Sequence, residues 1–402
     1  MFRRAVDSFV GLPLLIAAAC ALLCLAPDVS ADGWTAKWSN GFKVDSEDGS
    51  FKLKFGGRIM ADYTFVDADD SLVDLTEGDG FEFRRARFFF SGTIYDRVFF
   101  KANYDFADGD ADFKDVYIGL HLNKADLFFG HFFEPFSLEQ LTSSKYIAFL
   151  ERSLNNAFVP ERNSGVALQG YRGDKLDWGF GVFYDADGFG VSTDEDNINV
   201  TGRVSFRPLY EDDGKRMLHV GLSATQKDRA SSIRFRARPE AHFSDRFVDT
   251  GSFAADDAFI YGLEVAGVHN AFWFASEYTQ ADVSTPGSAD PSFDGGYVQF
   301  GYYLGGKGDY RRFKTKTGTF DRQKPKDSWG KEGGKGAWEI AFRYSTIDLN
   351  DGGVTGGEMD DWTLGLNWYP NPATRLLINW VHADVDQVGE ADFFLVRWQV
   401  DF

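Results

Sequence analysis

Apolar and polar side chains alternate with a period of two along most of the chain. In residues 51–65 every second position is apolar or glycine. The intervening positions include Lys52, Lys54, Arg58, Asp62 and Thr64. Because successive side chains of a strand point to opposite faces, this segment has one apolar and one polar face. About fifteen alternating residues exceed a typical globular strand and suffice to cross a bilayer at a tilt, so the pattern predicts a membrane-spanning strand.

Similar segments recur and number sixteen. They begin near residues 51, 81, 97, 112, 126, 163, 176, 197, 217, 257, 270, 294, 336, 358, 373 and 391. Bacterial outer-membrane barrels have an even number of antiparallel strands, with short periplasmic turns and longer extracellular loops. The pattern therefore predicts an all-β fold, a transmembrane antiparallel β-barrel of about 16 strands.

The connections between the segments alternate between short and long, as such a barrel requires. The long ones are residues 66–80, 134–162, 184–196, 226–256 and 282–293. Two connections, 207–216 and 305–335, fall on the side of the short turns although they are longer than expected. A barrel strand at Ile233–Pro239 would reverse the assignment of every later connection, so the count requires this segment to be part of a loop.

The N-terminus has the features of a cleaved export signal. Arg3 and Arg4 precede an apolar run over residues 12–25, which is too short to span a bilayer as a helix, and Ala31 ends a small-residue cleavage site. Both cysteines of the chain lie in this segment. A lipid anchor is the weaker alternative, because a leucine precedes Cys24.

These signals divide the chain into three parts. We expect residues 1–31 to be a signal peptide, residues 32–50 a loose N-terminal lead and residues 51–402 the barrel domain. The last segment alternates and ends on Phe402, an ending similar to that of outer-membrane barrels. An ordinary half-buried terminal strand is the alternative. Together with the export signal, the ending predicts an outer-membrane location.

The composition fits a barrel with an apolar exterior and a wet interior. The chain has 41 Phe, 16 Tyr and 10 Trp, yet its mean hydropathy is −0.30. A soluble β protein would have difficulty burying so many aromatic rings, whereas barrel strands present them to lipid. The net charge of −19 argues against a nucleic-acid partner, because phosphate backbones require a positive surface.

Arginines occur in a strand at residues 83–87. If the aromatic residues that follow face lipid, Arg85 and Arg87 point inward, as does Arg58 on the first strand. An arginine at mid-membrane depth is tolerable inside the barrel. Two interpretations remain open: a lumen wall neutralised by ion pairs, or an anion site, since a guanidinium stays charged and offers forked donors to oxyanions.

A second group, Arg234, Arg236 and Arg238, recurs at a spacing of two. An extended chain would place the three guanidiniums on one side, roughly 7 Å apart. Such a ladder could pass an anion stepwise if the loop carrying it folds inward. The alternative is a solvated basic stripe that binds lipopolysaccharide phosphates.

A third basic region is residues 307–335, where ten Lys and Arg residues, including Lys314 and Lys324, face four acidic residues. Lys52 and Lys54 lie near the same predicted end. A positive rim raises the local anion concentration; a charged turn without a transport role is the alternative. The acidic surplus lies at the opposite end, in Asp67–Asp70, Asp105–Asp112, Asp185–Asp196 and Asp384–Glu390, where it could bind divalent cations with lipopolysaccharide.

The sequence gives no indication of an enzyme. It contains no Gly-x-Ser-x-Gly elbow, His-Glu-x-x-His pair or phosphate-binding P-loop, and its six histidines are scattered. A barrel-embedded hydrolase would need a serine and a histidine within reach of each other. We expect neither catalytic activity nor a cofactor or metal.

Several separated motifs, in order, resemble the phosphate-selective porins O and P. The resemblance runs from about Phe51 to Phe402. Its residues are 83–87, Gly130–Lys145, Leu150–Arg152, Pro160–Arg162, Arg236–Glu240, Val248–Gly251, Glu277–Tyr278, Gly301–Leu304 and Asn367–Asn371.

The resemblance implies a sixteen-stranded, trimeric barrel whose loop 134–162 folds into the lumen and forms the constriction. It places Lys145 at the narrowest point with Arg58, Arg84 and Arg85 of the wall, and Asp115 nearby. It also implies that Arg234, Arg236 and Arg238 form an arginine ladder, and that Lys52, Lys54, Lys314 and Lys324 belong to a periplasmic basic cluster. Alternation alone puts Arg84 on the lipid side, so the resemblance requires a bulge or local twist there.

The sequence thus predicts an anion-selective, phosphate-preferring outer-membrane channel in contact with membrane lipid and lipopolysaccharide. A less selective porin for other small anions, organic acids, diphosphate or polyphosphate is the alternative. Arg87 favours the larger polyanions, because the resemblance leads us to expect an aromatic residue near that point. A secreted soluble β protein that binds a ligand is a third possibility.

Overall fold

The computed structural model describes residues 33–38, 41–107, 109–192, 197–228, 232–287, 289–305, 308–330 and 333–402. The predicted signal peptide, residues 1–31, lies outside these ranges. No helix among the described residues is long and apolar enough to cross a membrane.

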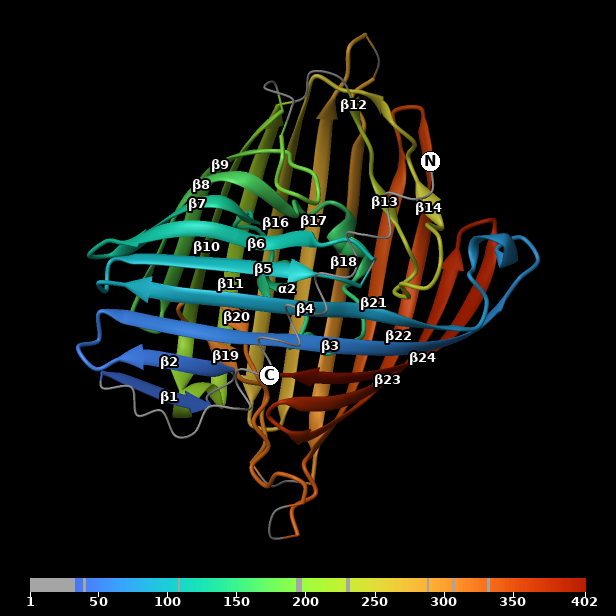
Figure 1. Ribbon diagram of the computed structural model, residues 1–402. Helices are drawn as coiled ribbons and strands as arrows, with labels where there is room; N and C mark the ends of the chain where they lie inside the picture. The colour runs from blue at the N-terminus through green and yellow to red at the C-terminus, as the bar shows by residue number, and fades with distance from the viewer. Residues whose placement is uncertain are drawn as a thin grey trace, which may run out of the picture.

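The described residues form a closed antiparallel barrel of sixteen strands (Figure 1). Its strands in chain order are β3 (Phe51–Ala68), β4 (Gly80–Ile94), β5 (Val98–Asp105), β6 (Asp112–His121), β7 (Ala125–Phe133), β8 (Arg162–Arg172), β9 (Leu176–Tyr184), β10 (Ile198–Glu211), β11 (Arg216–Asp228), β16 (Asp257–His269), β17 (Phe272–Ser284), β18 (Ser292–Leu304), β21 (Ala337–Asp351), β22 (Val354–Asn371), β23 (Thr374–Val385) and β24 (Gly389–Asp401). The predicted fold class is confirmed.

Each barrel strand pairs with its neighbours in sequence, and the last strand closes the sheet against the first. In the closing pair, β24 and β3, the register runs from Asp401 opposite Arg58 to Ala391 opposite Ala68. Closure satisfies the backbone hydrogen bonds of every wall strand, which the lipid interior demands. The turn from β4 to β5 is short because Tyr95 and Asp96 both take left-handed backbone angles (φ of 50° and 53°), as in a tight hairpin turn.

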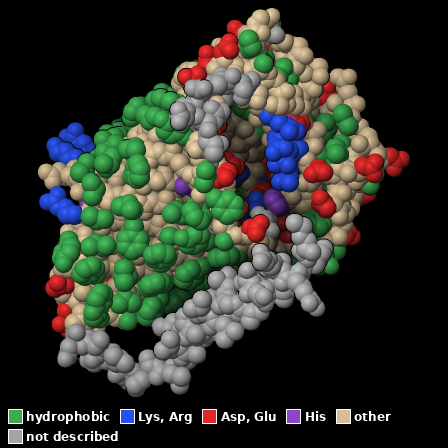
Figure 2. Space-filling view, turned by 45° about the horizontal axis from the view of Figure 1, so that its top comes forward, with side chains coloured by type: hydrophobic (Ala, Val, Ile, Leu, Met, Phe, Trp, Pro, Cys, Tyr) green, Lys and Arg blue, Asp and Glu red, His purple; other side chains and the backbone are tan. Residues whose placement is uncertain are grey.

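The barrel wall is apolar outside and charged inside. Phe81, Phe83 and Phe129 are each more than half exposed on the outer face. By contrast, Arg207 and Arg397 are 0% exposed although they belong to the longest side chains. Figure 2 shows the apolar side chains spread over the outer wall and basic side chains bordering the hollow of the barrel.

The expected loose N-terminal lead is partly ordered. Strands β1 (Trp34–Trp38) and β2 (Phe42–Ser46) form a hairpin, and β2 pairs with the first residues of β3. The pairing between β24 and β3 ends at Arg58. The hairpin continues the sheet beyond that point, so that β2 supplies backbone partners for Lys52–Phe55.

Three connections fold into the barrel. The inner loop, residues 134–161, contains the helix α2 (Leu138–Leu141) and the 3-10 helix η2 (Leu154–Ala157). The arginine loop, residues 232–256, contains β12 (Ser232–Ile233), β13 (Arg236–Ala237), β14 (Val248–Asp249) and β15 (Phe253–Ala254). The basic segment, residues 308–330, contains β19 (Phe313–Lys314) and β20 (Thr319–Phe320). Two further 3-10 helices lie in connections, η1 (Val73–Leu75) and η3 (Asp212–Gly214).

The inner and arginine loops enter from the end of the long loops. The basic segment enters from the opposite end, where the short turns lie, and Phe320 of β20 meets the inner loop through a backbone N–H bond to the Thr142 hydroxyl (3.2 Å). The predicted inward fold of loop 134–162 is therefore present. The inward fold of the basic segment has no counterpart in the prediction, which treated it as an overlong turn.

Candidate functional site

The inner loop is fixed at its first helix. The side chain of Ser137 caps α2 by accepting a hydrogen bond from the Gln140 backbone N–H. The carboxylate of Glu277 on β17 accepts the next two free backbone N–H groups, those of Leu138 (3.0 Å) and Glu139 (2.7 Å). A carboxylate at a helix N-terminus satisfies both the donors and the dipole, so these contacts fix where the loop enters the lumen.

Arginines of the wall hold the rest of the inner loop by its backbone carbonyl groups. Arg375 on β23 donates to the carbonyls of Ser144 (2.9 Å) and Ile147 (2.6 Å). Arg397 on β24 donates to the carbonyl of Leu150. A forked guanidinium can bind several acceptors at once, so the extended inner loop is pinned against the wall.

A bulge in β4 brings two consecutive arginines into the lumen. Met60 of β3 pairs with Arg85, but the next residue, Ala61, pairs with Phe83, so Arg84 has no partner in the register. The bulge shifts the alternation by one position, with Phe83 outside before it and Arg85 inside after it. Arg84 therefore points inward together with Arg85, as the resemblance required.

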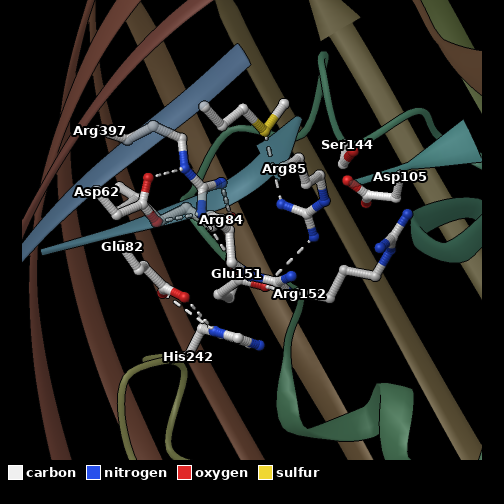
Figure 3. Close-up of polar contacts among 12 residues, drawn as sticks. Asp62, Glu82, Arg84, Arg85, Asp105, Ser144, Glu151, Arg152, His242 and Arg397 are labelled. Carbon is white, nitrogen blue, oxygen red and sulfur yellow. Dashed lines mark hydrogen bonds and ion pairs between the residues drawn. The ribbon is translucent and has the colours of Figure 1, made fainter. Parts of the chain in front are cut away.

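Glu151 of the inner loop is shared by three guanidiniums (Figure 3). Arg84 binds it with two hydrogen bonds of 2.9 and 3.0 Å, and Arg397 donates to it at 2.7 Å. Arg85 is more distant, with its Nη2 atom 3.6 Å from the carboxylate. Arg397 also binds Asp62 through two bonds of 2.7 and 2.6 Å, so two carboxylates face three arginines and one positive charge remains uncompensated.

The arginine loop spans the lumen above this cluster. The Nδ1 atom of His242 lies 2.9 Å from a carboxylate oxygen of Glu82 on the wall. Arg238 donates a hydrogen bond of 2.6 Å to the carbonyl of Ser244. Hydrogen bonds from Arg234 lower the pKa of Asp249, which favours the charged form of this carboxylate. Among the described residues, no carboxylate lies within ion-pair distance of Arg236.

Arg246 of the arginine loop is repelled by the other arginines of the same loop. Burial lowers the pKa of its guanidinium, and the neighbouring Arg238 and Arg236 lower it further. Like charges on one loop destabilise each other's charged forms, and an anion bound between them would relieve this repulsion.

Two cavities follow one another along the lumen. The turn-side cavity, about 650 Å³, lies between the inner loop and the basic segment; the loop-side cavity, about 620 Å³, lies between the inner loop and the arginine loop. The described lining of the first contains twelve Lys or Arg residues and three Asp; that of the second contains ten Lys or Arg and three Glu. Four arginines line both: Arg85, Arg87, Arg152 and Arg162. Positive side chains therefore predominate in the lining of both cavities, although the chain carries a net charge of −19.

Comparison with known proteins agrees with this geometry. The family described as phosphate-selective porin O and P matches residues 53–402. The chain belongs to this family. Porin O of Pseudomonas aeruginosa is 27% identical over the full length of both chains, and an uncharacterized protein of Caulobacter vibrioides is 33% identical over 85% of this chain and 70% of its own.

Solved structures show the same fold at low sequence identity. An anion-selective porin from Comamonas acidovorans is 12% identical, with a TM-score of 0.55 over 88% of this chain and all of its own. The trimer form of OmpT of Vibrio cholerae has the same identity, TM-score and coverage. The protein is thus an outer-membrane porin, a channel protein by its family.

Of the predicted wall and loop residues of the porin, Arg58, Arg85 and Lys145 line the turn-side cavity, whereas Arg84 lines the loop-side cavity. Arg58 donates to the Ser144 hydroxyl of the inner loop at 2.7 Å. Lys145 lies 3.4 Å from Asp401, a carboxylate that Arg322 also binds through two short bonds. Two cations therefore share this one carboxylate.

Asp115 of the porin lies in the same cavity and is held between two cations. Lys101 donates to one of its oxygens at 2.5 Å and Arg162 to the other at 2.9 Å. Arg162 also stacks over the Phe133 ring, 3.7 Å from its centroid. The acid therefore orients two basic groups at the junction of the two cavities.

The predicted basic cluster of the porin divides. Lys54 and Lys314 line the turn-side cavity. Lys52 is instead exposed and paired with Asp96 at 2.5 Å. Lys324 lines a separate cavity of about 460 Å³ at the turn end, next to Lys215. The three ladder arginines lie together along the loop-side cavity.

Sequence reasoning missed several basic residues of this porin's lumen. Arg203 and Arg322 line the turn-side cavity, and Arg152 and Arg162 line both cavities. Arg203 occupies an inward position of an alternating strand, so strand parity could have found it. Arg322 belongs to the predicted basic region 307–335, but nothing in the local pattern placed it inside the lumen, because the basic segment has no alternation.

Proposed function

We propose that this porin is an anion-selective, phosphate-preferring diffusion channel. Anions would enter past Arg234, Arg236 and Arg238, cross the narrow region beside Arg85 and Lys145, and leave through the lysine-lined turn-side cavity. The path is a series of fixed cations in water-filled space, which attracts anions and releases them stepwise.

One observation carries the proposal. The two cavities along the lumen have linings in which Lys and Arg far outnumber Asp and Glu, and four arginines line both. Three carboxylates of the lumen, Glu151, Asp401 and Asp115, are each shared between two or more cations. Ion pairs therefore account for part of the wall charge, and each lining as a whole keeps more cations than carboxylates.

Preference for phosphate over chloride follows from the donor chemistry. A guanidinium presents parallel N–H groups that match two oxygens of a tetrahedral oxyanion. Chloride has no such pair of acceptors. Arg85, Arg87, Arg152 and Arg162 at the junction could surround one oxyanion with several forked donors, whereas they contact chloride one bond at a time.

The decisive experiment is a phosphate titration of the single-channel chloride current in a planar bilayer. Phosphate that binds at the junction should block chloride current in a saturable manner at millimolar concentrations. Sulfate and gluconate at matched ionic strength are the controls for oxyanion charge and for size. Chloride current that does not respond to millimolar phosphate would refute phosphate preference.

Larger polyanions are the second candidate. The two cavities meet at four shared arginines, so an extended anion could occupy both at once. Arg87, where an aromatic residue was expected, is held by Asp105 at 2.6 Å and adds a guanidinium at this junction. Tighter block by diphosphate than by phosphate in the same titration would favour this candidate; equal or weaker block would exclude it.

We also propose that the porin assembles as a homotrimer within lipid and lipopolysaccharide. The family and the trimeric OmpT structure support the assembly. The apolar outer wall supports the contact with lipid. Light scattering of the detergent-solubilised protein, corrected for bound detergent, should give three times the chain mass, and a single chain mass would refute the trimer.

A further inference from the structure

A single wall residue, Arg343 on β21, binds both the inner loop and the arginine loop. Its guanidinium is 1% exposed inside the barrel. Its Nε and Nη2 atoms donate to Glu240 of the arginine loop, the Nε bond being 2.7 Å. Its Nη1 atom donates to Glu139 of α2 in the inner loop at 3.2 Å, and Nη2 also donates to the carbonyl of Glu151 at 3.1 Å.

On one side, Glu240 is the buried anchor of the arginine loop. Besides Arg343, its carboxylate accepts hydrogen bonds from the hydroxyls of Ser345 (2.6 Å) and Thr363 (2.5 Å). Its backbone N–H donates to Asp361 on β22 at 2.7 Å. Glu240 follows Arg238 by two residues, so the position of this anchor determines where the arginine ladder lies across the lumen.

On the other side, Arg343 contacts the inner loop at three separated points. Glu139 accepts its bond with one oxygen and holds the backbone N–H and hydroxyl of Ser153 with the other (3.0 and 2.8 Å). The guanidinium lies 4.5 Å from the Phe149 ring centroid. The third point is the backbone of Glu151, whose carboxylate binds Arg84 and lies next to Arg85.

We infer that Arg343 is a positioning residue that joins the inner loop and the arginine loop into one unit, so that a displacement of either loop displaces the other. The planar guanidinium fixes its acceptors in direction as well as distance, and both carboxylates that it binds are buried. Its importance for anions rests on the proposed function. The coupling itself does not, because it concerns the two loops alone.

The loops also touch where Phe158 packs against Phe235, with ring centroids 5.3 Å apart. This apolar contact is non-directional and can slide without loss of a hydrogen bond. The forked contact of Arg343 is therefore the one that fixes the register between the loops.

Deleting the guanidinium would leave Glu139 and Glu240 buried without their cation, and such a variant could fail to fold. The tests therefore use Glu240→Gln, which keeps the shape of the side chain, and Arg343→Lys, which keeps the charge but not the fork. Heat-modifiable mobility on gels reports whether each barrel has folded.

The experiment follows two cysteine reporters, since beyond residue 24 the sequence has no cysteine. Ser143→Cys reports on the inner loop and Arg246→Cys on the arginine loop; both positions line the cavities. The rate of modification by a charged methanethiosulfonate reagent is read as a change of bilayer current. Glu240→Gln removes charge-assisted bonds, and the rates at both reporters should rise about tenfold. Arg343→Lys should likewise raise both.

Two matched variants each free a short segment of one loop while Arg343 still holds Glu240 and Glu139, so neither loop is displaced as a whole. Glu82→Gln weakens the contact of His242 and should raise the rate at Arg246→Cys alone. Arg375→Lys weakens the grip on Ser144 and should raise the rate at Ser143→Cys alone. If Glu240→Gln accelerates the arginine-loop reporter alone, the coupling is refuted. Absence of phosphate block in the unmodified porin would refute the proposed function and leave this result untouched.

Discussion

Replacing Arg85 by glutamine should weaken phosphate block at least fivefold. Arg85 lines both cavities and is 4% exposed. Its nearest carboxylate oxygen, on Glu151, is 3.6 Å away and is shared with Arg84 and Arg397. An anion at this junction would therefore meet a guanidinium whose charge is poorly compensated.

The magnitude follows from Coulomb's law. Two unit charges about 4 Å apart interact by about 1 kcal/mol in bulk water and about 4 kcal/mol at an effective dielectric constant of about 20. The wet lumen lies between these limits and nearer the first. About 1 kcal/mol corresponds to a factor of about five in the dissociation constant, and a drier junction gives more.

The assay is the phosphate titration of chloride current with the Arg85→Gln channel. Arg85→Lys separates charge from geometry: it should keep chloride conductance but lose part of the phosphate preference, because a lysine lacks the fork. Arg216→Gln removes an exposed arginine that is paired with Glu211 at a turn, and should change nothing, since salt screens it from the lumen. Unchanged block in Arg85→Gln would refute the assignment of Arg85 to the anion path.

Three further changes test other parts of the site. Asp115→Asn frees Lys101 and Arg162 from their shared carboxylate and should tighten phosphate block about fivefold in the same titration; weaker block would contradict the orienting role given to this acid. Glu277→Gln replaces one of the two carboxylate oxygens that accept backbone N–H groups at the start of α2, so the inner loop should fluctuate and the open-channel current noise should rise, whereas a quiet channel would show that the loop does not depend on this cap. Arg236→Gln lowers the field of the arginine loop and should slow phosphate entry severalfold while leaving the release rate unchanged, as measured from the frequency and duration of blocking events; a change in duration alone would place Arg236 at a binding site rather than on the approach.

The strands could be predicted from the sequence because lipid and water impose alternation. Every wall strand must satisfy both environments, so the period of two survives in segments such as 51–65 and 389–401. All sixteen predicted starting points fall within a few residues of an observed barrel strand. The inward direction of Arg85 and Arg87 follows from the same rule.

The bulge at Arg84 could not be predicted from alternation, since a bulge is a local departure from it. The inward position of Arg84 is stabilised by Glu151, which lies 67 residues away in the inner loop. The pairing of Asp62 with Arg397 spans 335 residues and is likewise invisible to any local pattern. At Arg84 the family resemblance predicted the inward direction, whereas the alternation predicted a side chain facing lipid.

The basic segment is the largest feature that the sequence analysis did not anticipate. The sequence shows that this connection is long, but whether it folds into the barrel or out of it depends on partners far away in the sequence. Arg311 donates to the carbonyl of Tyr146 in the inner loop, and Arg322 binds Asp401 of the last strand. Tertiary contacts of this kind place a polar loop inside a barrel. The local sequence of such a loop predicts a solvated turn instead.

The zero-current potential across a potassium chloride gradient tests the central claim most directly. The claim is that cations fixed in the lumen outweigh the acidic remainder of the chain for an ion in transit. The account predicts a potential with the sign set by chloride diffusion, larger at low salt, where the fixed charges are less screened. A potential with the sign set by potassium diffusion would contradict it.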